Sequence, residues 1–324
     1  MKAAIVKAPQ SAPVYGDFAE PVARNGFTVV EVKASALTQI AKARASGAHY
    51  SSDGQFPVIA GVDGVGVTPE GRRVCFMLPE APFGALAERA LVDIQHCIEL
   101  PDTLDDVTAA AMANPGMSAW AALVERARLA PAETVLVNGA TGAAGRLAVQ
   151  LARYLGAQKI IATGRNAAAL QEVKALGADA VIAFAPDAAQ PLNSPQYEQA
   201  LLQEFAQGVD VVIDYLWGES ARILIAAIAK GVRDATPVRF VQVGSISGES
   251  IDLPGAGLRS SPIVLMGSGI KSLSRPALLN AVRRTFDVAA PANLRIAAKA
   301  VPLAQVERHW NDAGHPRVVF TIGG

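Results

Sequence analysis

The hydrophobic pattern of the chain changes near residue 108, from short strand-like runs to an alternation of strands and helices. Before that point the apolar runs are short, and glycine and proline separate them. Such spacing predicts a compact antiparallel β-barrel. Its expected strands cover residues 3–6, 28–32, 58–60, 73–76 and 88–92.

The second part of the chain has a different period. A helical pattern runs from residue 108 to about residue 128, and apolar runs then alternate with amphipathic ones, which predicts a parallel, doubly wound sheet. The expected strands cover 134–138, 159–163, 179–183, 209–214, 238–243 and 262–266, and the expected helices 143–155, 167–175, 196–206 and 219–229. Residues 186–195 are expected to form a surface loop. A last strand at 317–322 is expected to join the N-terminal barrel.

A glycine-rich turn joins the apolar run at 134–138 to the next helical pattern. Gly142 and Gly145 take the second and third places of a G-x-G-x-x-G dinucleotide fingerprint, with Ala140 in the first place. A missing side chain at Gly142 lets the backbone approach phosphate oxygens, and the N–H groups that open the helix supply donors. The predicted pyrophosphate site consists of Gly139, Ala140, Thr141, Gly142, Ala143, Ala144 and Gly145.

The next strand ends in Gly164-Arg165-Asn166, and Arg165 stands twenty residues after Gly145. NAD sites usually carry a carboxylate there, which accepts from the ribose 2′-hydroxyl, whereas a guanidinium pairs with a 2′-phosphate. Arg165 therefore favours NADPH, and a solvated arginine is the alternative interpretation. The lack of an acid in residues 158–167 counts against NAD without excluding it.

Composition and charge exclude several classes of protein. Lys plus Arg and Asp plus Glu both total 29, so there is no overall field to attract nucleic acid or an anionic membrane. The N-terminal apolar run is too short for a signal peptide, and no run approaches the roughly 18 apolar residues of a membrane span, so a cytoplasmic protein is expected. The two cysteines lack C-x-x-C spacing and suggest neither a disulfide framework nor a thiolate zinc site.

With these features in place, the chain resembles the medium-chain dehydrogenase/reductase superfamily, in its zinc-free quinone oxidoreductase branch. The matching pieces are Met1-Lys-Ala-Ala4, residues 56–66, Asn114-Pro-Gly-Met-Ser-Ala-Trp120, the glycine turn, and residues 176–182, 301–306 and 317–319. This resemblance implies an α/β protein: a GroES-like β-barrel catalytic domain of residues 1–112 and 270–324, and a Rossmann NADPH-binding domain of residues 113–269. It also implies an active site in the cleft between the two.

Departures from the zinc alcohol dehydrogenases bear on the chemistry. Where those enzymes carry zinc ligands, this chain has Thr38, Val62 and Asn114, and the cysteine-rich lobe of their structural zinc is missing. The resemblance therefore implies no metal site and no Lewis acid to polarise an oxygen. Metal-free hydride transfer from NADPH to a quinone or another conjugated carbonyl is the expected reaction.

Several residues gain a role through the resemblance. Tyr50 and His49 are candidate proton donors, with a non-catalytic place at the rim equally open. Thr38 stands at the place of a ribose-binding Asn. Small residues at the carboxyl ends of two strands are expected beside the nicotinamide, namely Val243, Gly244, Ser245, Gly267 and Ser268.

Two further stretches carry aromatic side chains. The segment 214–218 is expected on the wall of the cofactor cleft, although Tyr215 and Trp217 could instead be packing residues. Phe184 stands where similar enzymes carry an adenine-side tyrosine, and its ring is expected to pack on the adenine.

The leading hypothesis is an NADPH-dependent quinone reductase. A 2-enal or enoyl-thioester reductase and a non-catalytic NADPH-binding sensor are the alternatives. A small-molecule quinone or enone substrate is expected, with no nucleic acid or membrane partner. Similar proteins often join Rossmann sheets edge to edge, so a homodimer is expected, with residues 263–266 as the candidate edge strand.

Overall fold

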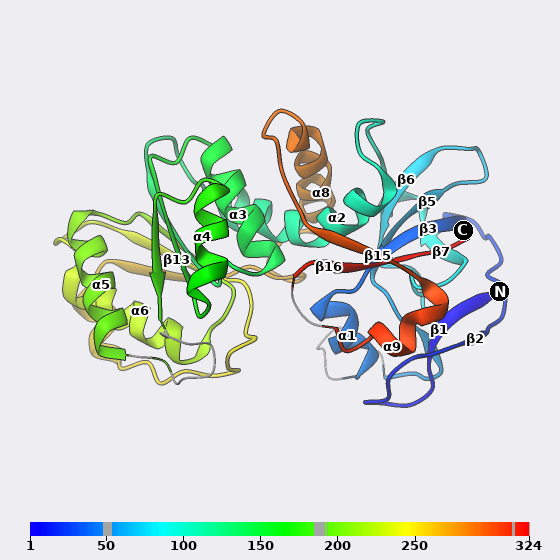
Figure 1. Cartoon of the computed structure of the whole chain (residues 1–324), viewed down its shortest axis with the longest axis horizontal. Helices are drawn as coiled ribbons and strands as arrows, with labels where there is room; N and C mark the ends of the chain where they lie inside the picture. The colour runs from blue at the N-terminus through cyan, green and yellow to red at the C-terminus, as the bar shows by residue number, and fades with distance from the viewer. Residues whose placement is uncertain (48–53, 185–191, 193, 313–314, 324) are drawn as a thin grey trace. The chain divides into compact units, whose positions relative to one another are not determined.

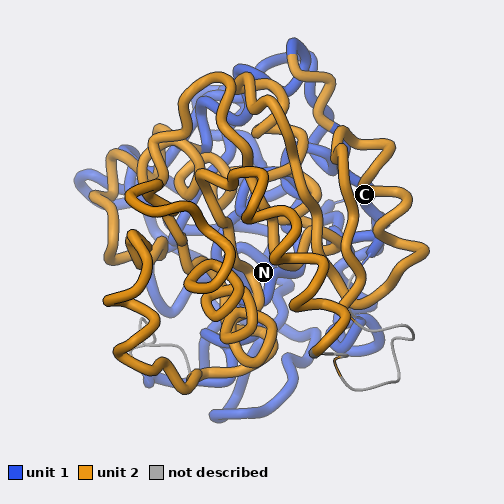
Figure 2. Tube along the Cα trace, turned by 90° about the vertical axis from the view of Figure 1, so that its left-hand side faces the viewer, with its two compact units in different colours: residues 1–114, 282–291, 295–324 blue, residues 115–281, 292–294 orange. Residues whose placement is uncertain are grey.

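The chain divides into two compact units in the computed structural model, which describes residues 1–47, 54–184, 192, 194–312 and 315–323 (Figure 2). Unit 1 comprises Met1–Asn114, Val282–Pro291 and Arg295–Gly324, and unit 2 comprises Pro115–Ala281 and Ala292–Leu294. Among the described residues, no helix is both long and apolar enough to cross a membrane.

Unit 1 is built on two sheets. Its strands are β1 (Lys2–Val6), β2 (Val14–Asp17), β3 (Phe27–Ala36), β4 (Val58–Ile59), β5 (Asp63–Val67), β6 (Arg73–Met77), β7 (Arg89–Asp93), β8 (Cys97–Glu99), β15 (Ala298–Pro302) and β16 (Arg317–Thr321). One sheet has the order β2-β1-β4 and the other β15-β16-β3-β5-β6-β8, with β7 also paired to β3. Every strand pair within residues 1–112 is antiparallel, as the sequence predicted, whereas β15 and β16, from residues 298–321, pair in parallel.

Strand β5 was not among the predicted strands, because two glycines interrupt its apolar run. A side-chain carbon on Gly66 would lie 2.2 Å from the carbonyl oxygen of Glu31, and one on Gly64 would lie 2.7 Å from the Phe76 ring. The glycines are therefore required by the close approach of β3 and β6 rather than by a turn. They also interrupt the alternation of apolar and polar residues by which a strand is recognised in sequence.

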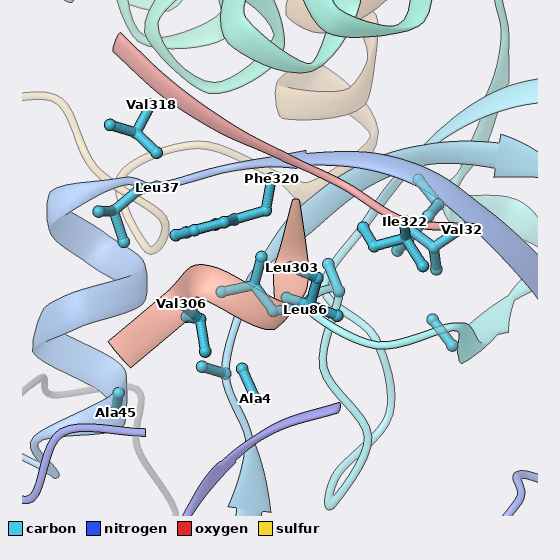
Figure 3. Packing of buried hydrophobic residues seen from close by; sticks show 14 of the residues in the cluster. Ala4, Val32, Leu37, Ala45, Leu86, Leu303, Val306, Val318, Phe320 and Ile322 are labelled. Atoms are coloured by element: carbon cyan, nitrogen blue, oxygen red, sulfur yellow. The ribbon is translucent and has the colours of Figure 1, made fainter. Parts of the chain in front are cut away.

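The two sheets of unit 1 share one core, to which both ends of the chain contribute. Figure 3 shows Ala4 of β1 near Leu303 and Val306, with Phe320 and Ile322 from the last part of the chain in the same cluster. Phe320 is fully buried, a contribution of about 2 kcal/mol relative to exposure. Strand β16 pairs with β3, which confirms the expectation that the final strand joins the N-terminal barrel.

Unit 2 contains a single parallel sheet. Its strands are β9 (Thr134–Asn138), β10 (Lys159–Gly164), β11 (Ala180–Ala183), β12 (Val211–Asp214), β13 (Val238–Gln242) and β14 (Ile263–Gly267). Their order is β11-β10-β9-β12-β13-β14, and every neighbouring pair is parallel, which confirms the predicted doubly wound sheet. The order reverses between β9 and β12, and ligands of such sheets bind at that place, outside the carboxyl ends of the strands.

Helices complete both units. They are α1 (Gln39–Ala45), α2 (Asp106–Trp120), α3 (Ala143–Tyr154), α4 (Ala167–Ala175), α5 (Ser194–Gln207), α6 (Gly218–Gly231), α7 (Gly255–Arg259), α8 (Arg275–Ala289) and α9 (Val306–His309), with a π-helix at Ala121–Arg126 and 3-10 turns at Ile94–His96 and Leu303–Gln305. In unit 2, α3 and α4 lie on one face of the sheet and α5 and α6 on the other (Figure 1). Leu147 and Leu151 of α3 are fully buried, one helical turn apart, as the apolar spacing predicted.

Candidate functional site

The glycine turn lies at the carboxyl end of β9, where the strand order reverses. Gly139 has φ +85°, which favours glycine, and the N–H groups of Gly139 and Ala140 both donate to the Thr163 carbonyl at 3.0 Å. The Gly142 N–H donates to the Gly139 carbonyl at 3.2 Å. Within the described residues, four N–H groups at the turn and the first turn of α3 keep no acceptor: those of Thr141, Ala143, Ala144 and Gly145.

The glycines of the turn differ in what the fold demands of them. A side-chain carbon on Gly145 would lie 2.4 Å from the Gly139 carbonyl oxygen, so α3 packs against β9 only with glycine there. The same carbon on Gly142 would meet nothing closer than that oxygen at 3.7 Å. Gly142 also has an ordinary φ of −77°. The described structure therefore gives no packing or backbone reason for glycine at position 142.

Arg146 fixes the turn from within α3. Only 8% of this residue is exposed, its Nε donates to the Thr141 carbonyl at 3.0 Å, and its Nη2 pairs with Glu172 of α4 at 2.7 Å. A charged hydrogen bond of this kind is roughly twice as strong as a neutral one. Arg146 thereby ties the turn to both α3 and α4.

Arg165 follows β10 beside the turn. A side-chain carbon on Gly164 would lie 3.1 Å from the Thr141 methyl, so the end of β10 and the glycine turn are neighbours. Arg165 is exposed, and it makes no ion pair or hydrogen bond within the described part of the chain. The Asn166 side chain is already engaged, since its Oδ1 accepts from the Ala169 N–H at 3.0 Å and caps α4.

A buried polar network lies under the turn, between the ends of β9, β10 and β12. Asn138 Nδ2 donates to Asp214 Oδ1 at 2.8 Å and to Ser220 Oγ at 3.1 Å. Thr163 Oγ1 donates to Asn138 Oδ1 at 2.7 Å. Burial raises the pKa of Asp214 to about 6, against the hydrogen bonds from Leu216 and Asn138 that favour the carboxylate. Sequence reasoning missed Asn138, although a polar residue ending each of two neighbouring buried strands is a usable signal.

The segment after β12 has an unusual backbone. Trp217 has φ +57° and ψ −153°, a region that residues with side chains rarely adopt. The Asp214 carboxylate accepts from the N–H groups of Leu216, at 3.0 Å, and Trp217, at 3.1 and 3.2 Å. The half-buried indole packs edge-on against Phe240 at 6.4 Å between ring centroids.

The two segments predicted beside the nicotinamide also lie at the carboxyl ends of their strands. The Val243 N–H donates to the Asp214 carbonyl at 2.7 Å, and the Ser268 N–H donates to the Gln242 carbonyl at 2.8 Å. Gly267 is exposed and its carbonyl accepts from Arg126 Nε at 2.8 Å, a contact that no local sequence pattern indicates. Ser245 is exposed as well.

Thr38 belongs to unit 1, unlike the other predicted cofactor residues that the structure describes. It is 2% exposed, and its Oγ1 accepts from the Ala41 N–H at 2.9 Å, so this hydroxyl caps α1. A small cavity of about 60 Å³ borders the same helix and is also lined by Gly61 and Val62. His49 and Tyr50 lie outside the described residues.

A second buried carboxylate lies in unit 1, at the start of β5. Asp63 is fully buried, and neither of its carboxylate oxygens has a hydrogen-bond partner in the described part of the chain. Burial raises the pKa of Asp63 to about 7, and the positive charge of Arg317 opposes that rise. The same burial lowers the pKa of Arg317.

Phe184 does not lie where the resemblance implied. It is 4% exposed and packs edge-on against Tyr197, with ring centroids 5.4 Å apart, inside the core of unit 2. The expectation that its ring packs on adenine was therefore wrong, because the ring is buried in the apolar interior between β11 and α5. Among the described residues, no group of three His, Cys, Asp or Glu side chains is arranged to hold a metal ion.

Comparisons with known proteins agree with this architecture. The zinc-binding dehydrogenase family matches residues 143–275. A probable NADPH-dependent quinone reductase from Emericella nidulans is 26% identical over 323 residues, covering 87% of this chain and 88% of that protein. A phenolphthiocerol/phthiocerol polyketide synthase from Mycobacterium tuberculosis is 32% identical over 229 residues, which are 66% of this chain but only 9% of that protein.

Solved structures extend the likeness to the whole chain. The quinone oxidoreductase of Thermus thermophilus, whose complex with NADPH was also solved, has a TM-score of 0.81 and 27% identity, covering 99% of this chain and all of that one. A mycobacterial quinone oxidoreductase has a TM-score of 0.82 at 20% identity over 99% of this chain and all of that one, a likeness of fold.

The fold is of the two-domain, dinucleotide-binding type. It combines a doubly wound parallel sheet, a glycine turn where the strand order reverses, and a GroES-like unit. The relatives and the solved structures narrow this assignment from a fold to a family. The matched family, the relatives and the solved structures support the medium-chain dehydrogenase/reductase superfamily, quinone oxidoreductase-like.

Proposed function

We propose that this chain is an NADPH-dependent oxidoreductase that transfers hydride, without a metal, to a quinone or a similar conjugated carbonyl. The observation that carries the proposal is the exposed Gly142 turn, with its unengaged N–H groups, beside the unpaired guanidinium of Arg165 among the described residues. The relative from Emericella nidulans, named as a probable NADPH-dependent quinone reductase, supports it.

The pyrophosphate is held at residues 139–145. Four backbone N–H groups at the start of α3 are available as donors, and the helix dipole there also favours negative charge. They belong to Thr141, Ala143, Ala144 and Gly145. Gly139 and Ala140 shape the turn without donating to the phosphates, because their own N–H groups already donate to the Thr163 carbonyl. An exposed glycine with open space around it, at position 142, fits the close approach of a phosphate group.

Arg165 takes the 2′-phosphate of NADPH. Its guanidinium has no competing partner among the described residues, and it follows the strand end that touches the turn through Gly164. Gly164 supplies close packing and Asn166 the helix cap, so neither side chain is required to touch the nucleotide. The preference for NADPH over NADH therefore rests on one charge-assisted contact.

The chemistry needs little from the side chains. Bound NADPH supplies a hydride, and a conjugated acceptor delocalises the charge that arrives with it. The backbone of Val243, Gly244 and Ser245, and of Gly267 and Ser268, holds the carboxamide end from the carboxyl edge of the sheet. We assign ribose binding to Thr38 and proton donation to Tyr50 or His49. The positions of the family's zinc ligands hold Thr38, Val62 and Asn114, so orientation is the main catalytic contribution.

The second candidate function is reduction of a 2-enal or an enoyl thioester. Relatives named 2-haloacrylate reductase from a Burkholderia species and prostaglandin reductase-3 from Bos taurus favour an activated alkene as acceptor. A non-catalytic NADPH-binding sensor would bind the cofactor and turn over no acceptor.

Stopped-flow oxidation of NADPH separates these candidates. Wild-type protein is mixed with a panel of quinones, 2-enals and enoyl thioesters, with NADH run in parallel. Quinones are expected to give the largest kcat/KM. A panel in which enals or enoyl thioesters win by tenfold or more would replace the quinone assignment with the second candidate, and tight NADPH binding without turnover on any acceptor would establish the sensor.

Arg165→Ala tests the cofactor preference. Loss of a charged hydrogen bond costs about 1.5–3 kcal/mol, so KM for NADPH is expected to rise about 10- to 100-fold while KM for NADH changes little. Lys174→Ala is the matched control, because it removes an exposed positive charge from the other end of α4. Equal use of NADPH and NADH by the wild type would remove the assigned role of Arg165.

The same proposal includes a homodimer formed through β14. This strand pairs with β13 on one side and ends the sheet on the other, and its Val264 is 46% exposed. An unpaired strand edge with an apolar side chain is suited to pairing with a second copy.

A further inference from the structure

We propose that Asp214 is a positioning residue for the dinucleotide: its buried carboxylate fixes residues 215–218, and that segment sets the spacing between the glycine turn and the loop after β13. The inference rests on the proposed function, since it assigns a residue to the same cofactor site. Asp214 touches no part of the nucleotide and acts through the backbone that follows it.

The first contact of this segment is with the glycine turn. The Tyr215 N–H donates to the Asn138 carbonyl at 3.0 Å, which joins the two strand ends at the switch point. A side-chain carbon on Gly139 would lie 2.9 Å from Leu216 Cδ2 and 3.3 Å from Tyr215 Cβ. The position of Leu216 therefore limits where the turn at residue 139 can lie.

The second contact is with the loop after β13. The Val243 and Gly244 N–H groups donate to the Asp214 carbonyl at 2.7 and 3.2 Å, and the Ser247 N–H donates to the Leu216 carbonyl at 2.9 Å. A side-chain carbon on Gly244 would lie 2.6 Å from the Tyr215 carbonyl oxygen. Segment 215–218 is thus packed between the pyrophosphate turn and a loop assigned to the nicotinamide.

The carboxylate is what holds this segment in place. It accepts from Leu216 N–H, Trp217 N–H and Asn138 Nδ2, and Trp217 is held at φ +57° and ψ −153°. Such a backbone persists only when its surroundings over-determine it, and strained residues cluster at ligand sites. Burial also makes the network costly to break, because an unsatisfied donor would remain away from water.

Asp214→Asn is the first test. An amide has one acceptor oxygen and no negative charge, and its NH2 group would face either the Trp217 N–H, at the place of Oδ2, or the Leu216 N–H and Asn138 Nδ2, at the place of Oδ1. The dissociation constant of NADPH, measured by titration calorimetry, is expected to rise about 10- to 100-fold, the effect of losing hydrogen bonds to a charged group. At saturating NADPH, kcat is expected to change less than KM.

The exchange Asn138→Asp with Asp214→Asn is the rescue variant. The carboxylate introduced at position 138 would accept from Thr163 Oγ1 and from the NH2 group of the new amide at position 214, whose oxygen then faces the Trp217 N–H while the Leu216 N–H loses its acceptor. The total charge and the number of acceptors are unchanged. Its NADPH dissociation constant is expected to lie between those of the wild type and of Asp214→Asn, because part of the network is restored.

Asp210→Asn is the matched structural control. Asp210 Oδ2 accepts from the Thr134 N–H at 2.8 Å, so it makes the same kind of bond just before β12, the strand that Asp214 ends. This variant is expected to lower the thermal midpoint without changing NADPH affinity. A merely structural Asp214 would behave in the same way.

The outcomes separate the two proposals. Wild-type protein that binds no NADPH overturns the proposed function itself. Wild-type protein that binds NADPH, with Asp214→Asn folded and unchanged in affinity, overturns only the positioning role. An exchange variant that fails to fold, or that binds NADPH no more tightly than Asp214→Asn, also overturns it, because the proposal requires the restored part of the network to recover part of the affinity.

Discussion

Gly142→Ala separates a glycine kept for a ligand from a glycine kept for the fold. The added carbon would meet only the Gly139 carbonyl oxygen, at an ordinary 3.7 Å, and alanine accepts φ −77° and ψ 166° without strain. Removing a glycine also restricts the unfolded chain, so the free protein is expected to gain about 0.4–1 kcal/mol of stability. The same methyl group would occupy the space that a phosphate oxygen needs above the N–H groups of α3.

NADPH affinity is therefore expected to fall by at least about tenfold, or about 1.4 kcal/mol, while the thermal midpoint of the free protein stays level or rises. Gly145→Ala is the matched variant. Its carbon would lie 2.4 Å from the Gly139 carbonyl oxygen and 2.6 Å from Ala140 Cα, so α3 must shift away from β9. Overpacking of this kind costs about 1–3 kcal/mol.

The assay is a pair of measurements on each variant: the thermal midpoint without ligand, and the NADPH dissociation constant by titration calorimetry. Gly145→Ala is expected to lower the midpoint by about 2–4 °C for each kcal/mol lost. If Gly142→Ala bound NADPH as tightly as the wild type, residues 139–145 would not be the pyrophosphate site. If it unfolded like Gly145→Ala, the reasoning from open space would be wrong.

Two further predictions concern the rest of the chain. Because the pKa of Asp63 is raised from 3.8 to about 7 in the folded state, the folded protein binds the extra proton between these values, and its stability falls as pH rises through about 7. The thermal midpoint of Asp63→Asn minus that of the wild type should therefore increase from about pH 5 to about pH 8, and a constant difference would contradict a titrating Asp63. Val264→Glu places a charge on the exposed side of β14, so sedimentation velocity should show a wild-type dimer and a variant monomer; a wild-type monomer would end the dimer proposal.

The sequence was most informative where hydrophobic period and glycine spacing agree. Helix 167–175 was predicted with the bounds that α4 has, and strand 134–138 with those of β9. Local signals suffice there, because an apolar strand run, a turn and an amphipathic helix follow one another within a few residues. Strand β5 was missed because its glycines are required by close contacts with β3 and β6, which no local pattern indicates.

The polar network could not be predicted for the same reason. Asn138 and Asp214 are 76 positions apart, and only the strand order β9-β12 brings their side chains together. Phe184 looked like a ligand contact from its place in the order of motifs, yet the direction of its side chain depends on α5, whose packing no local pattern specifies. A site built from the ends of parallel strands is visible in sequence only as isolated residues.

Strand β16 lies between β3 and β15, so the sheet of unit 1 is completed by residues 317–321. During synthesis, therefore, residues 34–36 of β3 leave the ribosome long before their partners in β16, whereas residues 27–31 can pair early with β7. Residues 115–281 of unit 2, in contrast, emerge as one continuous stretch. The Rossmann sheet can form while the chain still grows, whereas the larger sheet of the GroES-like unit is completed only after residues 317–321 have been made.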